Sequence, residues 1–155
     1  MTNRGKQFET IVKESFEKCY NTSIIRLHDQ TSGFRGSANI CDFIVYHYPY
    51  MYPIECKSIH GNTLPFSNIT DKQYKGMLEV SKTFGVLAGV LCWWVDKDVT
   101  AFIPIHEIAM CKDNGYKSIR FDHIPFFEDG FIKIPGKKKR VFFDYDMNKL
   151  FEREW

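Results

Sequence analysis

The start of the chain repeats small or apolar residues every three or four positions, with polar residues between them. The repeating positions are Phe8, Ile11, Val12, Ser15, Phe16 and Cys19. Because this spacing matches the turn of an α-helix, it predicts an amphipathic helix over residues 5 to about 20.

A second helical pattern begins with a capping signal at Thr70. Gln73 follows three residues later, as in a capping box, in which each side chain binds the backbone N–H of the other residue. Gly85 is expected to end this helix, because glycine is common just past a helix C-terminus. The expected inner face carries Tyr74, Met77, Leu78, Ser81 and Phe84.

Between these helical patterns, β-branched and aromatic residues predict strands at residues 23–28, 41–47 and 52–58. Proline suits a turn and resists continuing a ladder. The last two strands are therefore expected to form an antiparallel hairpin with its turn centred near Tyr48 and Pro49.

The apolar run at residues 86–95 is typical of a strand buried on both faces, and residues 99–105 are expected to return beside it. The order of elements predicts an α/β fold with a mixed central β-sheet flanked by helices. Since 155 residues show no linker, we expect a single domain over residues 1–155. The weaker patterns predict a short helix at 104–112, short strands around 131–134 and 141–145, and a last helix from Asp146.

Neither a secretion signal nor a membrane span is predicted. No hydrophobic segment follows the basic N-terminal residues, and the run at 86–95 is far shorter than the ~20 residues of a membrane helix. Five cysteines without a Cys-x-x-Cys pair favour reduced thiols. We therefore expect an intracellular protein that makes no membrane contact.

The predicted hairpin brings three chemically active side chains together. If its turn lies near Pro49, Asp42 faces Glu55 across the strands, with β-carbons about 4.5–5.5 Å apart. Lys57 lies two residues beyond Glu55 and therefore shares its face of the sheet. Two carboxylates and one ammonium group would converge there.

Two close carboxylates repel each other, so this arrangement makes most sense if a cation neutralises them. Magnesium fits best, since it takes one or two carboxylates, keeps several waters and completes its octahedron with phosphate oxygens. The residues favour phosphodiester hydrolysis, in which Lys57 orients the attacking water or offsets charge on the phosphate. The alternative is an ordinary hairpin with exposed ion pairs worth about 0–1 kcal/mol.

Two further observations concern neighbours of this patch. Glu9 lies beside the apolar stripe of the first helix, so it is either a surface residue or a third acid that reaches the hairpin. Cys41 and Cys56 are expected as cross-strand neighbours on the face opposite the acids. They are either small core residues or, with His47 or His60, zinc ligands.

The net charge of +2 does not by itself indicate a polyanionic partner, but the basic residues are unevenly placed. The alternative for each is a solvated surface charge. The candidate DNA contacts are these basic residues and Ser58: Arg4, Lys6, Arg35, Ser58, Lys72, Lys75, Lys137, Lys138, Lys139 and Arg140.

Several short motifs share their order and spacing with one nuclease family. They are Arg4-Gly-Lys-Gln-Phe-Glu9, Asp42 with Glu55-Cys-Lys57, Phe66-Ser-Asn68-Ile69, and Gln73 with Met77. Together they resemble the RecU-type Holliday junction resolvases, which belong to the PD-(D/E)xK nuclease superfamily. The likeness covers roughly residues 4 to 120 and implies a restriction-endonuclease-like core.

This resemblance implies roles for individual residues. Asp42 and Glu55 would bind Mg²⁺ or Mn²⁺, and Lys57 would be the catalytic lysine. Glu9 would assist the metal site, and Gln73 would lie near the scissile phosphate. The implied activity is paired nicking of a four-way DNA junction by a homodimer, whose two-fold symmetry suits that substrate.

The chain departs from the longer bacterial members, which carry an extended projection before the metal-binding aspartate. Only residues 29–39, with Arg35 between two glycines, are available here, so the chain looks more like shorter phage relatives. One alternative function is another PD-(D/E)xK endonuclease acting on duplex DNA. The other is a non-catalytic DNA-binding recombination accessory protein whose acids are vestigial.

Overall fold

A six-stranded sheet forms the centre of the structure, a computed structural model that describes residues 3–28, 39–123, 130–153 and 155. The described strands follow the order β1-β2-β3-β5-β6-β8, and neighbours are antiparallel except β3 and β5, which are parallel. They are β1 (Thr22–Arg26), β2 (Phe43–His47), β3 (Tyr50–Ile59), β5 (Gly89–Trp94), β6 (Val99–Pro104) and β8 (Ile132–Lys133).

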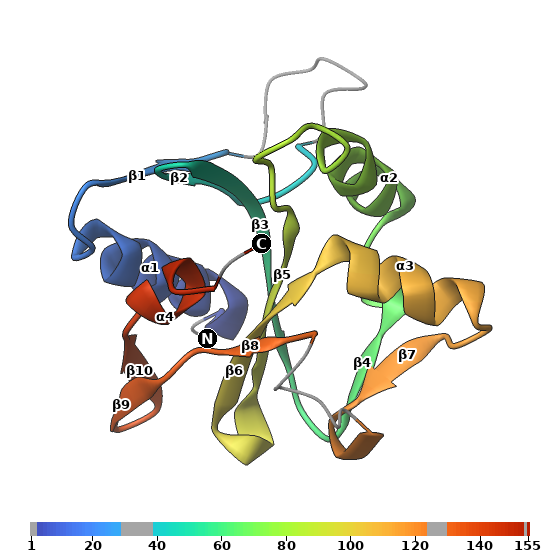
Figure 1. The fold of residues 1–155 in the computed structure, drawn as a ribbon. Helices are drawn as coiled ribbons and strands as arrows, with labels where there is room; N and C mark the ends of the chain where they lie inside the picture. The colour runs from blue at the N-terminus through green and yellow to red at the C-terminus, as the bar shows by residue number, and fades with distance from the viewer. Residues whose placement is uncertain (1–2, 29–38, 124–129, 154) are drawn as a thin grey trace.

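Helices cover both faces of this sheet. Figure 1 shows α1 and α4 with the β9–β10 pair on one side, and α2 and α3 on the other. The predicted α/β fold with a mixed central sheet is confirmed. The helices are α1 (Arg4–Glu17), α2 (Asp71–Val80), α3 (Ile105–Asp113) and α4 (Asn148–Phe151), and the 3-10 helices are η1 (Phe66–Asn68), η2 (Val95–Lys97) and η3 (Phe121–His123). The smaller strand pairs are β4 (Thr63–Pro65) with β7 (Ser118–Arg120), and β9 (Gly136–Lys139) with β10 (Phe142–Tyr145).

Strand β5 lies between two apolar layers and is buried along its whole length. Leu91 and Trp93 pack in the cluster formed with α1. Val90 and Trp94 pack in the cluster formed with α2 and α3. Since successive side chains of a strand point to opposite faces, this alternation confirms the predicted strand with two buried faces.

The β2–β3 hairpin has the register that the sequence predicts. Phe43 lies opposite Ile54, and His47 lies opposite Tyr50, which places the turn at Tyr48 and Pro49. The hairpin is therefore paired as the candidate site requires.

Helix α2 begins as predicted but ends early. Thr70 and Gln73 form the capping box. The helix ends before Phe84, whose side chain is fully exposed rather than on the inner face. The chain leaves the helix because the next segment joins the sheet, where the Gly85 carbonyl accepts a hydrogen bond from the Met51 N–H at 2.8 Å.

Near the C-terminus, strands β8 and β10 and helix α4 lie close to the positions that the sequence predicts. Strand β9 was not predicted, because it is exposed throughout and holds Gly136 and three lysines, so no apolar alternation marks it. Among the helices within the described ranges, none is both long and apolar enough to span a lipid bilayer.

Gly89 allows close contact between β5 and β6. A Cβ atom at this position would lie 2.6 Å from Phe102 Cζ and would also clash with the Ile103 carbonyl. We expect Gly89→Ala to lower the free energy of unfolding by about 1–3 kcal/mol, because overpacking strains a close-packed core. Urea unfolding measures this loss.

Gly115→Ala is the matched control. Gly115 has φ +85° and open space around the position of a Cβ, so the substitution adds only backbone strain of about 1–2 kcal/mol. A loss for Gly89→Ala below about 1 kcal/mol would contradict the packing argument.

Candidate active site

Asp42 directly precedes Phe43, which with Ile54 forms the last registered pair of β2 and β3. Its N–H donates to the Ile54 carbonyl at 3.0 Å, and its carbonyl accepts from the Leu27 N–H at 2.8 Å. Since Phe43 lies opposite the same Ile54, this bond is offset by one residue from the ladder. The Asp42 carboxylate reaches the Cys56 N–H and is close enough to Glu55 for its charge to act on Asp42, so the two acids meet as the sequence predicts.

Glu55 and Lys57 face the α2 side of the sheet. They alternate along β3 with Ile54 and Cys56, which pack in the cluster formed with α1. Ile59, two residues beyond Lys57, packs in the cluster formed with α2 and α3. The hairpin therefore presents both acids and the lysine toward α2.

One carboxylate oxygen of Glu55 is held by two donors. Oε2 lies 2.9 Å from Lys57 Nζ and accepts a 2.7 Å hydrogen bond from Gln73 Nε2. The Glu55 side chain is only 4% exposed, whereas that of Lys57 is 22% exposed. The carboxylate is thus interior, and the ammonium group lies at the rim.

The other oxygen of Glu55, Oε1, is buried without a hydrogen-bond partner within the described structure. An unpaired buried oxygen is costly unless another group, such as a cation, satisfies it. Together with the Asp42 carboxylate it provides the hard oxygen donors that Mg²⁺ prefers. The residues therefore fit a divalent ion.

Asp42 is also restrained and electrostatically perturbed. Its Oδ2 accepts a 2.8 Å hydrogen bond from the Cys56 N–H. Burial, followed by the charge of Glu55, raises the pKa of Asp42 from 3.8 to about 7, although the Cys56 N–H opposes this change. The sequence predicted the proximity of the acids but not this backbone hydrogen bond.

Gln73 joins α2 to the acids. Its Oε1 accepts from the Thr70 N–H at 3.0 Å, while its Nε2 donates to Glu55. The predicted capping role and the contact with the site are therefore made by opposite ends of one amide.

Glu9 is placed differently. Its Oε2 lies 2.7 Å from Arg26 Nη2. No group of three His, Cys, Asp or Glu side chains that could hold a metal occurs in the part of the chain that the structure describes. The structure thus brings Asp42 and Glu55 together, and the assisting role of Glu9 stays a prediction.

Cys41 and Cys56 lie on opposite faces of the sheet, so the prediction that they share the face opposite the acids is wrong. Cys56 packs on the α1 side, whereas Cys41 packs with α2 and α3. The ladder ends at Asp42, where the backbone bends, so the strand alternation no longer orients Cys41. Both thiols are buried and free.

The candidate DNA contacts divide into two groups. Lys6, Lys72 and Lys75 are exposed, Arg4 and Ser58 are half-buried, and Arg35 lies outside the described residues. The basic residues 137–140 lie on the β9–β10 pair, across the sheet from Glu55 and α2 (Figure 1). Lys72 and Lys75, which lie on α2, are therefore separated from residues 137–140 by the sheet.

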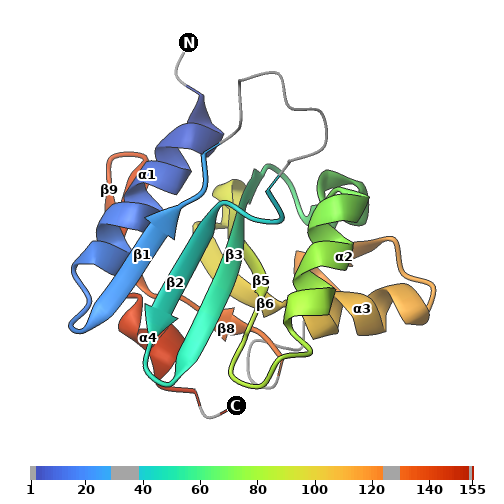
Figure 2. The same cartoon turned by 90° about the horizontal axis from the view of Figure 1, so that it is seen from above.

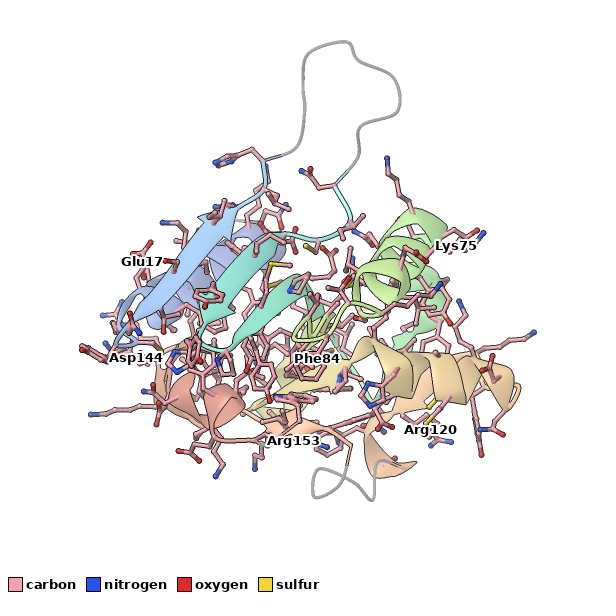
Figure 3. The ribbon with its side chains drawn as sticks, turned by 45° about the horizontal axis from the view of Figure 1, so that its top comes forward. Glu17, Lys75, Phe84, Arg120, Asp144 and Arg153 are labelled. Atoms are coloured by element: carbon pink, nitrogen blue, oxygen red, sulfur yellow. The ribbon has the colours of Figure 1, made fainter. Side chains whose placement is uncertain are left out.

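Two lysines of the β9–β10 pair are already in ion pairs. Lys138 Nζ lies 2.6 Å from Asp98 Oδ2, and Lys139 Nζ lies 2.7 Å from Asp144 Oδ2. Figure 3 shows Asp144 and Lys75 at opposite sides of the molecule. Any DNA contact by these lysines would be remote from the acids.

The raised pKa of Asp42 should make stability depend on pH. The folded protein keeps the Asp42 proton up to about pH 7, whereas an unfolded aspartate loses it near 3.8, so stability falls as pH rises through this window. In chelator, we expect Asp42→Asn to show a smaller fall between about pH 4 and 7 than the wild type. Urea unfolding at stepped pH measures both, and equal falls would contradict the shift.

The chain resembles a curated protein in sequence and a solved structure in fold. No family model matches the chain. It is 24% identical over 168 residues to the SPbeta prophage-derived uncharacterized protein YotM of Bacillus subtilis, and the match covers 96% of this chain and 85% of YotM.

The structural likeness is to Hjc, a Holliday junction resolvase from the archaeal hyperthermophile Archaeoglobus fulgidus. The TM-score is 0.50 at 19% sequence identity, and the match covers 66% of this chain and 78% of Hjc. The chain therefore has the restriction-endonuclease-like fold that Hjc has.

Proposed function

We propose that the protein is a metal-dependent DNA endonuclease that resolves four-way junctions by paired nicking. The observation that carries this proposal is the buried carboxylate of Glu55, with Oε1 unpaired in the described structure, beside Asp42 and Lys57. The fold shared with Hjc supports it, since Hjc is a Holliday junction resolvase.

Asp42 and Glu55 are the residues that would hold Mg²⁺, for which Mn²⁺ could substitute, and Glu9 is a third candidate. When bound, the ion would supply Lewis acidity and a water of lowered pKa. The Cys56 N–H holds one Asp42 oxygen, and Gln73 holds one Glu55 oxygen, so both carboxylates keep fixed orientations.

Lys57 would act on the phosphate and the attacking water. Its Nζ, 2.9 Å from Glu55 Oε2, lies at the partly exposed rim of the site. From there it can orient the water or stabilise negative charge that develops on the phosphate.

The DNA would lie over the end of the sheet at which strand β1 ends and strand β2 begins. Arg4, Lys6, Ser58, Lys72 and Lys75 are the proposed contacts there. We also propose a RecU-type homodimer, because two symmetric sites match the two strands cut in a junction. Such a substrate places the protein inside the cell, and the prophage-derived relative supports a phage origin.

We expect Lys57→Ala and Asp42→Asn to lower the cleavage rate of a synthetic four-way junction at least about 100-fold, because each removes a group from the reacting centre. Junction affinity, measured without metal by fluorescence anisotropy, should stay within about threefold, a change of under 1 kcal/mol.

Lys82→Ala is the matched control for these variants. Lys82 is 73% exposed, pairs with Glu79 and lies beyond the C-terminal end of α2, whereas Gln73, which contacts Glu55, lies in the first turn of that helix, so cleavage should be unchanged. Wild-type cleavage that persists in chelator would overturn the metal mechanism.

Metal binding can be tested without any activity. We expect millimolar Mg²⁺ to raise the melting temperature of the wild type, because a ligand of the folded state stabilises it. Asp42→Asn and Glu55→Gln should abolish this increase, since each removes a carboxylate donor. An equal increase in all three proteins would place the ion elsewhere.

A second candidate is an endonuclease of the same superfamily that cuts duplex DNA. The short segment before Asp42, residues 29–39, favours it, because longer resolvases engage the junction with a projection there. Cleavage of a junction and of a linear duplex of matching sequence at fixed salt separates the two functions. Tight binding without any cleavage in Mg²⁺ or Mn²⁺ would instead favour a non-catalytic accessory protein.

A further inference from the structure

Three polar side chains from distant segments form a connected chain at the end of β3. Arg4 begins α1, His60 directly follows β3, and Asp96 lies in η2 after β5. Arg4 Nη1 lies 2.7 Å from His60 Nε2, and His60 Nδ1 lies 3.1 Å from Asp96 Oδ1. The sequence alone predicts no such contacts for His60 or Asp96.

The direction of each hydrogen bond follows from the chemistry of the groups. A guanidinium group only donates, so His60 Nε2 must accept from Arg4. Nδ1 therefore carries the ring proton and donates to Asp96. The contact with Arg4 requires neutral His60 in this one tautomer.

Asp96 is in turn fixed by the backbone. Its Oδ2 accepts from the Gly61 N–H at 2.6 Å. Gly61 has φ +76°, a conformation that glycine adopts without strain. The Gly61 N–H and His60 together hold the pKa of Asp96 below its usual value, which keeps the acceptor charged.

The chain of contacts ends where the proposed substrate would lie. In Figure 2 the first turn of α1 lies toward the same end of the sheet at which β1 ends and β2 begins. Arg4 contacts His60, which directly follows β3, the strand that carries Glu55 and Lys57. His60 lies three residues beyond Lys57, about 10 Å along an extended chain. One DNA strand has a phosphate every ~3.4 Å of helix axis, so a strand with its scissile phosphate at Lys57 has others within this span.

We propose that His60 and Asp96 are positioning residues that hold the Arg4 guanidinium against a DNA phosphate beside the cleaved one. This inference rests on the proposed nuclease function. The contact to His60 uses one of five guanidinium N–H donors, which leaves enough donors for a phosphate. Restraining a long side chain before binding lowers the entropy lost on binding.

Two substitutions of His60 separate positioning from simple packing. Glutamine places an amide near the position of Nε2 and can still accept from Arg4, whereas asparagine places its amide near Nδ1 and reaches only Asp96. Because His60 is exposed, both variants should fold, and thermal melting checks this.

The measurement is the dissociation constant for a labelled four-way junction in chelator, over a series of salt concentrations. Arg4→Ala should weaken binding about tenfold and lower the salt slope by ~0.9, as expected for one lost phosphate contact. His60→Asn should weaken binding about three- to tenfold, while His60→Gln should stay within about twofold of the wild type. Adding His60→Asn to Arg4→Ala should cause no further loss, because the positioned group is already gone.

Three results would each overturn the positioning role. The first is additive losses of affinity in the double variant. The others are equal effects of the two His60 substitutions on affinity and an unchanged salt slope for Arg4→Ala. In these outcomes wild-type binding and cleavage remain, so the nuclease proposal stands. A wild type that neither binds nor cleaves the junction would overturn both proposals.

Discussion

The site depends on holding two carboxylates side by side, one of them almost completely buried. Removing a carboxylate from water costs several kcal/mol unless it is paired and hydrogen-bonded. Lys57 and Gln73 compensate one oxygen of Glu55, and the Cys56 N–H compensates one oxygen of Asp42. Glu55 Oε1 has no hydrogen-bond partner among the described residues, and the pKa of Asp42 is raised, so negative charge at the site is not fully compensated there.

The fold makes this arrangement possible because β3 is an interior strand. It pairs antiparallel with β2 and parallel with β5, so its position is fixed from both sides. Helix α1 covers one face of β3, and α2 approaches the other with its N-terminus toward Glu55. The hydrophobic layers thus supply the rigidity that the polar groups could not provide for themselves.

The sequence predicted what local patterns determine. The turn at Pro49 set the β2–β3 register, and the register brought Asp42 close to Glu55. The sequence did not predict where helix α2 ends, because the following loop leaves the helix to hydrogen-bond with Met51. It also did not predict the face of Cys41, because the backbone bends at Asp42.

Contacts between distant segments were also beyond the sequence. Arg4 and His60 are 56 positions apart, and Gln73 and Glu55 are 18 apart. Nothing in local spacing relates such residues, because the packing of helices against the sheet decides which of them meet. The likeness of motifs suggested that Gln73 lies near the chemistry, but not that it binds the acid.

Gln73 links the start of helix α2 to the buried acid, and this double contact restricts which residue the position can hold. Glutamate is the usual alternative at this place in a capping box and would preserve the start of the helix. Here it would turn a donor toward Glu55 into a third negative charge against a buried one. A replacement that preserves a capping box in other helices would therefore destabilise the acid pair in this protein.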